Sequence, residues 1–308
     1  MRNLIAIAAL FVFAACASVA PAPSTEVSVP KLTVGPGDAL FIGAGDIAVC
    51  PGIVNAKATG DLVRAVLQEH PDAVVFTVGD NVYENGAAAE FVECYDPAWG
   101  SFNRITRPTS GNVEYRVDPK SYYDYYDWFD QHPEARRGYY SYDLQSWHIV
   151  SLDSNQDHTA GSPQLQWLDA DLKASTKPCT LAYWHHPRYS SSRHGNHTDI
   201  EPFWDTLLSH GADVVLNGHD HNYERFNQQD DNATPSTTGI AQFVVGMGGK
   251  NLYDFTTIQP NSGKRDNTHY GILALTLHAG SYDWALIGTD GLVYDQSSAP
   301  TNCNPAPR

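Results

Sequence analysis

The sequence predicts one α/β domain whose central strands are mainly parallel. The chain has 308 residues, of which 42% are apolar, and this is enough for one large core. An apolar run at 39–42 is followed by apolar residues at helical spacing over 62–67 and by a second apolar run at 73–78. A strand, a helix and a strand in this order pair in parallel through a crossover connection.

After an irregular middle region the pattern of strands and helices resumes. Strands are predicted at 147–152, 180–184, 214–216 and 242–245, and helices at 164–173 and 203–208. Pro163 is typical of a helix start, and Gly211 of a helix end. Residues 270–277 and 282–287 alternate around a small polar turn and predict a hairpin.

Residues 86–146 are irregular and rich in aromatic side chains. Loops and short hairpins over the ligand-binding end of the sheet are expected there. The tyrosines of residues 122–142 either line a substrate groove or pack an insertion, and packing is the more frequent role for such a cluster.

The net charge of −16 disfavours nucleic acid as a partner, because two polyanions repel each other. An acidic protein can still act on a phosphorylated small molecule if cations dominate the site locally. The sequence does not predict an oligomeric state.

Residues 1–20 are typical of a secretory signal, with Arg2, an apolar run and then small residues. The run Phe13-Ala14-Ala15-Cys16 resembles a bacterial lipoprotein cleavage box, with Cys16 as the lipid anchor. The alternative is cleavage after Ala20, which Pro21 disfavours. Both predict export, to the periplasm, to a membrane as a lipoprotein, or into the medium.

The composition also predicts the domain boundaries. Residues 21–37 are rich in proline, serine and threonine and are expected to form a linker. The globular domain is then expected over residues 38–296, with a C-terminal tail at 297–308.

Cysteine usage agrees with export. Cys16 belongs to the signal region, and the other four cysteines form an even set, which predicts disulfide bonds in an exported protein. Four cysteines allow three connectivities, of which Cys50–Cys94 with Cys179–Cys303 is favoured. Free buried thiols are the alternative.

Polar residues of ligand type follow several predicted strands directly. A single Gly-Asp after a strand is an ordinary turn, but several coincidences at strand ends predict a shared site, because ligands bind at the carboxyl edge of α/β sheets. The residues concerned are Asp46, Asp80, Asn112, His185, and the pair His219 and His221 in the stretch ADVVLNGHDHNYER.

Two carboxylates, an amide oxygen and three imidazoles suit a pair of hard-to-borderline cations. Two metals about 3.5–4 Å apart bind a phosphoryl oxygen and lower the pKa of a bound water. A carboxylate between the metals would hold the pair together, and Asp80 is the candidate for that bridge.

Five motifs resemble those of the calcineurin-like metallophosphoesterase superfamily: GDIA (45–48), GDNVY (79–83), GN (111–112), WHHP (184–187) and GHDH (218–221). The tyrosine of GDNVY is similar to that of the purple acid phosphatase branch. The resemblance covers roughly residues 39–290. It implies a four-layer α/β/β/α sandwich and a metal-dependent phosphatase that cleaves phosphomonoesters with a metal-activated hydroxide.

The resemblance also implies a role for each site residue. The first metal, ferric iron in that family, would be held by Asp46, Asp80, Tyr83 and His221. The second, a divalent iron, zinc or manganese ion, would be held by Asp80, Asn112, His185 and His219. A ferric and a divalent ion carry five positive charges, and Asp46, Asp80 and the tyrosinate of Tyr83 carry three negative ones. Roughly two positive charges would remain to attract a phosphate ester.

Two further histidines lie near the WHHP motif. His194, nine residues after His185, is similar to the family histidine that helps to protonate the leaving group. His186, the neighbour of a predicted ligand, is expected to be structural rather than a ligand.

One position departs from the family pattern, because Val113 replaces the histidine that contacts phosphate or leaving group. Such a group contributes typically 10²–10⁴-fold to a rate. Two alternatives to a phosphomonoesterase therefore stay open. One is a phosphodiesterase or nucleotide hydrolase, and the other is a catalytically weak lipoprotein that binds metal or phosphate.

Overall fold

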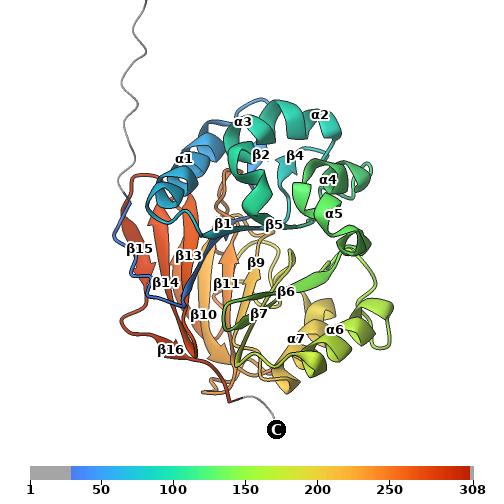
Figure 1. Ribbon diagram of the computed structural model, residues 1–308, viewed down its shortest axis with the longest axis vertical. Helices are drawn as coiled ribbons and strands as arrows, with labels where there is room; N and C mark the ends of the chain where they lie inside the picture. The colour runs from blue at the N-terminus through green and yellow to red at the C-terminus, as the bar shows by residue number, and fades with distance from the viewer. Residues whose placement is uncertain (1–28, 306–308) are drawn as a thin grey trace, which may run out of the picture.

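Two seven-stranded sheets pack face to face in the computed structural model, which describes residues 29–305 (Figure 1). Helices cover the outer face of each sheet: those at 54–137 lie over one sheet, and α6 and α7 over the other. The predicted four-layer α/β/β/α sandwich is confirmed. The predicted signal at 1–20 lies outside the described residues.

The first sheet contains both the crossover and the hairpin that the sequence predicts. Its order is β15 (Val293–Gln296), β14 (Ser281–Gly288), β13 (Gly271–Leu277), β1 (Ala39–Ala44), β3 (Val74–Val78) and β5 (Thr106–Thr109), with β16 (Thr301–Asn302) on β14. Strands β1, β3 and β5 are parallel, with α1 (Val54–Glu69) between β1 and β3. Strands β13 and β14 are antiparallel, with Leu273 opposite Leu286.

The second sheet has a parallel centre. Its order is β12 (Ser262–Asp266), β10 (Tyr223–Gln229), β11 (Ile240–Val245), β9 (Val214–Asn217), β8 (Cys179–Tyr183), β7 (Trp147–Ser151) and β6 (Tyr140–Leu144). Strands β7, β8, β9 and β11 run parallel to one another. The antiparallel β6, β10 and β12 were not predicted. A short parallel ladder of β2 (Ala48–Val49) and β4 (Val82–Tyr83) follows β1 and β3.

Both helices over the second sheet begin or end at the residues that the sequence indicates. Helix α6 (Pro163–Ala174) begins after Ser162, whose hydroxyl accepts a hydrogen bond from the amide of Leu165 at 3.2 Å. Helix α7 (Glu201–Ser209) ends before Gly211, which has a φ of 72°. A left-handed residue just after a helix favours glycine, which has no Cβ to clash.

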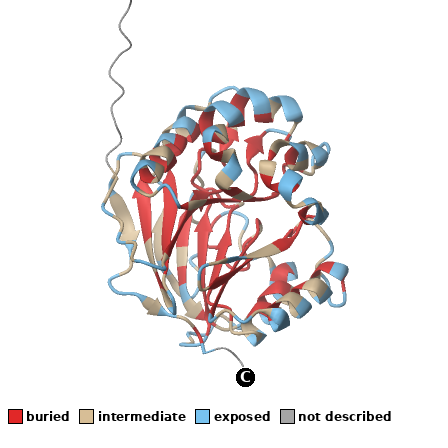
Figure 2. Cartoon of the chain, viewed as in Figure 1, coloured by how far each residue is buried: buried red, intermediate tan, exposed pale blue. Residues whose placement is uncertain are grey.

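Three apolar cores hold the four layers together (Figure 2). The core between the sheets includes Phe41, Leu216 and Leu273, all fully or almost fully buried. The other two cores join each sheet to its helices. The inner faces of the helices are buried and their outer faces are exposed, as expected for amphipathic helices over a sheet.

The aromatic region folds mainly into short helices, so the expected hairpins are wrong for most of it. Its helical elements are α2 (Ala88–Glu90), a π-helical turn (Phe91–Tyr95), α3 (Asp96–Trp99), a 3₁₀ helix (Gly100–Ile105), α4 (Lys120–Tyr125), α5 (Asp127–Gln131) and a second 3₁₀ helix (Pro133–Arg137). Tyr122 and Tyr126 are almost fully buried in the core between the first sheet and its helices. They pack the insertion rather than line a groove.

Both favoured disulfides, Cys50–Cys94 and Cys179–Cys303, are formed. The second one ties the C-terminal segment to β8. Next to it, the carboxylate of Asp213 accepts hydrogen bonds from the backbone amides of Thr180 and Asn304. No helix within residues 29–305 is long and apolar enough to cross a membrane.

We expect the Cys179→Ala/Cys303→Ala variant to lose about 2–5 kcal/mol of unfolding free energy, because its disulfide closes a loop of 124 residues. The measurement is urea denaturation without reductant, followed by circular dichroism. Adding dithiothreitol should destabilise the natural protein more than this variant. An unchanged midpoint in the variant would contradict the structural role of this bond.

Candidate metal centre

Loops that follow strands of both sheets, together with β4, which carries Tyr83, bring the predicted site residues to one place. Asp46 follows β1 and Asp80 follows β3 in the first sheet, and Asn112 comes shortly after β5. His185 follows β8, and His219 and His221 follow β9, in the second sheet. The site therefore lies where the carboxyl ends of the two sheets meet.

Four predicted ligands form a first group around the phenol oxygen of Tyr83. This oxygen lies 2.6 Å from Oδ1 of Asp46, 2.9 Å from Oδ2 of Asp80 and 3.2 Å from Nε2 of His221. Nε2 of His221 is also 3.3 Å from Oδ1 of Asp46. Three oxygens and one nitrogen thus face a common point in the protein interior.

The other predicted ligands form a second group around the amide oxygen of Asn112. This oxygen lies 3.2 Å from Nε2 of His185 and 3.1 Å from Nδ1 of His219. Nε2 of His185 is 3.3 Å from Oδ1 of Asp80. Asp80 therefore turns one carboxylate oxygen to each group, as a bridging carboxylate would.

The backbone at the strand ends is strained at these residues. Asp46, Asp80 and His219 have φ values of 57°, 49° and 69°, a region that side chains other than glycine rarely occupy. Such strain is typical of functional sites, where the surrounding structure imposes the conformation. Gly79 precedes Asp80 with a φ of 87°, and a Cβ there would lie 2.7 Å from Nδ1 of His185. Only glycine fits at that position.

Backbone carbonyls fix the orientation of two of the imidazoles. Nδ1 of His185 lies 2.8 Å from the carbonyl oxygen of Val78, and Nδ1 of His221 lies 2.9 Å from that of Asn251. An N–H donated to a carbonyl leaves the lone pair of Nε2 pointing into the cluster. This tautomer is the one that binds a metal.

Glu114 joins the two loops of the first sheet, and the sequence did not single it out as a site residue. Its buried carboxylate accepts hydrogen bonds from the amides of Asp80 at 3.0 Å, Asn81 at 2.8 Å and Gly111 at 2.7 Å. Burial and the negative charge of Asp80 raise the pKa of Glu114 to about 7. Its neighbour Val113 is fully buried, and its amide donates to Oδ1 of Asp80 at 2.8 Å.

The electrostatics of the cluster fit a cation between these groups. Burial, together with the negative charges of Asp46 and Asp80, raises the pKa of Tyr83 well above its ordinary value. Burial alone would lower the pKa of His185, but the charge of Asp80 outweighs it and raises this pKa to about 10. The carboxylates thus favour positive charge at this point, and cations suit the same oxygen and nitrogen donors.

A ring of imidazoles surrounds His219. The ring centres of His194, His186 and His197 lie 4.3, 4.4 and 5.0 Å from that of His219. Nδ1 of His194 lies 3.0 Å from Oδ1 of the buried Asp220, which fixes the ring. Burial lowers the pKa of His219, His186 and His197.

Sequence reasoning missed His197 and assigned His186 a structural role. Nitrogen atoms of His185, His186 and His219 lie within 4.8 Å of one another, so His186 lies next to two predicted ligands. Its Nδ1 is paired with the hydroxyl of Ser154 at 2.8 Å. His197 follows His194 by three residues in the same loop, and this spacing was the one available signal.

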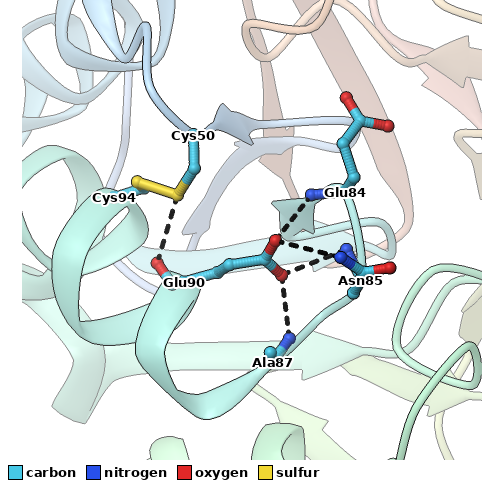
Figure 3. Close-up of a disulfide and its surroundings, with 6 residues drawn as sticks. All are labelled: Cys50, Glu84, Asn85, Ala87, Glu90 and Cys94. Carbon is cyan, nitrogen blue, oxygen red and sulfur yellow. Dashed lines mark hydrogen bonds between the residues drawn. A yellow bond between two sulfur atoms is a disulfide. The ribbon is translucent and has the colours of Figure 1, made fainter.

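The segment after Tyr83 is held in place by Glu90 (Figure 3). Its carboxylate accepts hydrogen bonds from the amides of Glu84 at 2.9 Å, Asn85 at 3.0 Å and Ala87 at 2.9 Å. The Cys50–Cys94 disulfide lies beside the backbone carbonyl of Glu90 and links the residue after β2 to the π-helical turn. Together they brace the short ladder that carries Tyr83.

Curated relatives of the chain are purple acid phosphatases. Purple acid phosphatase 15 of Arabidopsis thaliana is 27% identical over 241 residues, which are 67% of this chain and 45% of the relative. Purple acid phosphatase 22 of the same plant is 31% identical over 184 residues, 52% of this chain and 42% of the relative. The chain thus spans less than half the length of these two relatives.

Solved structures share the fold at low sequence identity. The purple acid phosphatase PPD1 of yellow lupin (Lupinus luteus) matches with a TM-score of 0.67 and 18% identity, over 84% of this chain and 53% of that one. GAP50 of Plasmodium matches with a TM-score of 0.66 and 11% identity, over 87% and 89% of the two chains.

The sequence profile of the calcineurin-like phosphoesterase family matches residues 40–223. This range includes all five motifs and the strand ends that carry the two ligand groups. The chain therefore belongs to the calcineurin-like phosphoesterase family, and its relatives lie in the purple acid phosphatase branch.

Proposed function

We propose that the protein is a dinuclear-metal hydrolase of phosphate esters, with phosphomonoesters as its substrates. The observation that carries this proposal is the position of Asp80, whose two oxygens face two separate groups of metal-ligating atoms. The family and its purple acid phosphatase relatives support phosphoester hydrolysis as the reaction.

The donor sets suggest which metal each group would hold. Asp46, Tyr83 and His221, with Asp80, supply hard oxygen donors and suit ferric iron. Asn112, His185 and His219, with Asp80, suit a divalent iron, zinc or manganese ion. When bound, the two metals supply positive charge for the phosphate and lower the pKa of a bound water.

The chain's own residues handle the proton of the leaving group. His194 lies at the edge of the cluster with about a third of its side chain exposed, so a substrate can reach it. Asp220 accepts a hydrogen bond from Nδ1 of His194, so in the imidazolium form of the ring Nε2 carries the second proton, which it can give to the departing oxygen. His186, whose ring centre lies 4.4 Å from that of His219, is a further candidate donor for phosphate oxygens.

The alternative of a weak metal- or phosphate-binding protein rests on Val113. A buried valine donates no side-chain hydrogen bond, but the rings of His186, His194 and His197 offer three imidazoles around His219. These rings favour catalysis over binding alone. A phosphodiesterase uses the same donor sets and differs only in its substrate.

We further propose an exported location, either periplasmic or anchored through a lipid on Cys16. The two disulfides support export, because such bonds persist in oxidising compartments.

The purified protein is expected to contain about two metals per chain and to show a visible charge-transfer band from Tyr83 to ferric iron. Tyr83→Phe should lose this band, because the phenol oxygen lies within 3.2 Å of three other predicted ligands. Elemental analysis and absorption spectroscopy measure both effects. Tyr95→Phe is the matched control, because Tyr95 is also a buried tyrosine but lies in the core between the first sheet and its helices.

A colourless protein with two zinc ions, unchanged by Tyr83→Phe, would contradict the ferric assignment. It would leave the hydrolase proposal standing.

The metal-loaded protein should hydrolyse p-nitrophenyl phosphate faster than bis-p-nitrophenyl phosphate. Asp80→Asn should lower kcat/KM by more than about 100-fold, because loss of even an outer metal partner costs up to about that factor. The exposed Asp143→Asn, outside the site, is the control. A faster rate on the diester would favour the phosphodiesterase, and phosphate binding without any hydrolysis would refute the enzyme.

His194→Asn should slow substrates with poor leaving groups most. We expect about a 100-fold loss of kcat for an alkyl phosphate and a much smaller loss for p-nitrophenyl phosphate, whose leaving group needs no proton. The slope of log kcat against leaving-group pKa measures this effect, with His132→Asn as control. An equal loss on all substrates would remove His194 from proton transfer.

A further inference from the structure

One cation stands at the edge of the site without an assigned role. Arg193 directly precedes His194 in the loop after β8, and its side chain is exposed. The guanidinium carbon lies 4.3 Å from the centre of the Tyr253 ring. At this distance the positive charge is attracted to the face of the aromatic ring, which holds the side chain in place.

Tyr253 connects this cation to the predicted metal ligands. Its ring stacks on that of His221, with centres 3.8 Å apart and planes inclined by 21°. The rings of Tyr253 and His194 are in an edge-to-face arrangement, with their centres 5.6 Å apart. The amide of Tyr253 donates to the carbonyl of His221 at 2.8 Å, which fixes the backbone as well. Arg193 is thus one aromatic ring away from a predicted ligand.

The loop that carries Arg193 is tied to the segment that carries Tyr253. Ser192 and Phe255 form an antiparallel bridge, and the amide of Thr256 donates to the carbonyl of Ser191 at 2.8 Å. The buried hydroxyl of Ser190 bonds to Oδ2 of Asp220 at 2.5 Å. These contacts fix the backbone that leads to Arg193.

The positive charge of Arg193 is not paired with a carboxylate in the described part of the chain. Within the part of the chain that the structure describes, Arg188 pairs with Glu201 and Arg225 with Asp295, whereas no carboxylate lies at ion-pair distance from Arg193. The nearby carboxylate of Asp220 is occupied by His194 and Ser190. In a protein with a net charge of −16, such a free guanidinium attracts an anion to this point.

We propose that Arg193, held on Tyr253, binds a second phosphoryl group of the substrate, so that this enzyme favours compounds with two adjacent phosphates. The inference rests on the proposed function, in which the scissile phosphate occupies the cluster of Asp80 and the histidines. The ring of Tyr253 separates Arg193 from that cluster, so the guanidinium reaches the neighbouring phosphate instead. Its planar fork matches two phosphate oxygens at once.

Hydrolysis of such a diphosphate is balanced with water alone. The oxygen of water forms a bond to the scissile phosphorus and loses one proton, while the bond from that phosphorus to the bridging oxygen breaks. The bridging oxygen leaves with the second phosphate, which Arg193 holds, and takes a proton from the imidazolium of His194; the proton released by the water replaces it.

The test compares inorganic pyrophosphate with p-nitrophenyl phosphate on the metal-loaded full chain. Arg193→Gln should lower kcat/KM about tenfold more for pyrophosphate than for p-nitrophenyl phosphate, because one charge-assisted interaction is lost. Arg193→Lys should recover part of this ratio, since the charge remains without the planar fork. The matched control is Arg137→Gln, because Arg137 lies over the rings of Tyr139 and Trp167, away from the site.

A binding experiment separates this inference from the proposed function. Calorimetry with methylenediphosphonate and orthophosphate, neither of which turns over, should give a diphosphonate affinity that falls about tenfold in Arg193→Gln relative to phosphate. Equal losses for both ligands, or none, would overturn the subsite. If the natural protein hydrolyses neither substrate but shows this difference in binding, the hydrolase fails and the subsite stands.

Discussion

The site depends on the carboxylate of Asp80 and on what holds it. Its two oxygens reach Tyr83 on one side and His185 on the other, and its backbone amide is bound by the buried Glu114. These contacts join loops that follow β3, β5 and β8, so one residue links the carboxyl ends of both sheets. The strained φ of Asp80 and the absence of space for any Cβ at Gly79 show how tightly the fold imposes this position.

Burial of so many ionisable groups is costly unless their charges are balanced. Burial and the charges of Asp46 and Asp80 raise the pKa of Tyr83, and the charge of Asp80 raises that of His185 against the effect of burial. Cations between these donors would provide the balancing positive charge. The overall acidity of the protein then matters less to a phosphate than the local charge within the cluster.

Much of this arrangement follows from the sequence, because local patterns specify it. The β1–α1–β3 crossover, the β13–β14 hairpin and both disulfides were predicted, and the motifs indicated the four layers. The short helices at 88–137 were not, because their aromatic residues pack without a helical period. The sequence also did not identify Glu114, His197 and Tyr253 as residues of the site, for another reason. Each acts through contacts with residues far along the chain, such as Tyr253 on His221, and no local pattern encodes such contacts.

The site divides into two parts that the chain holds by different means. The predicted ligands are buried and fixed by strand ends, carbonyls and strained backbone. His194, His197, Arg193 and Tyr253 instead lie on two surface segments that pair through Ser192 and Phe255. Substitutions in these two segments would change which substrate group next to the phosphate is bound. The two groups of predicted metal ligands would keep their positions. Val113 lies in the buried part, whereas His194 and His197 belong to the other part, so the proposed proton donor does not depend on the side chain at position 113.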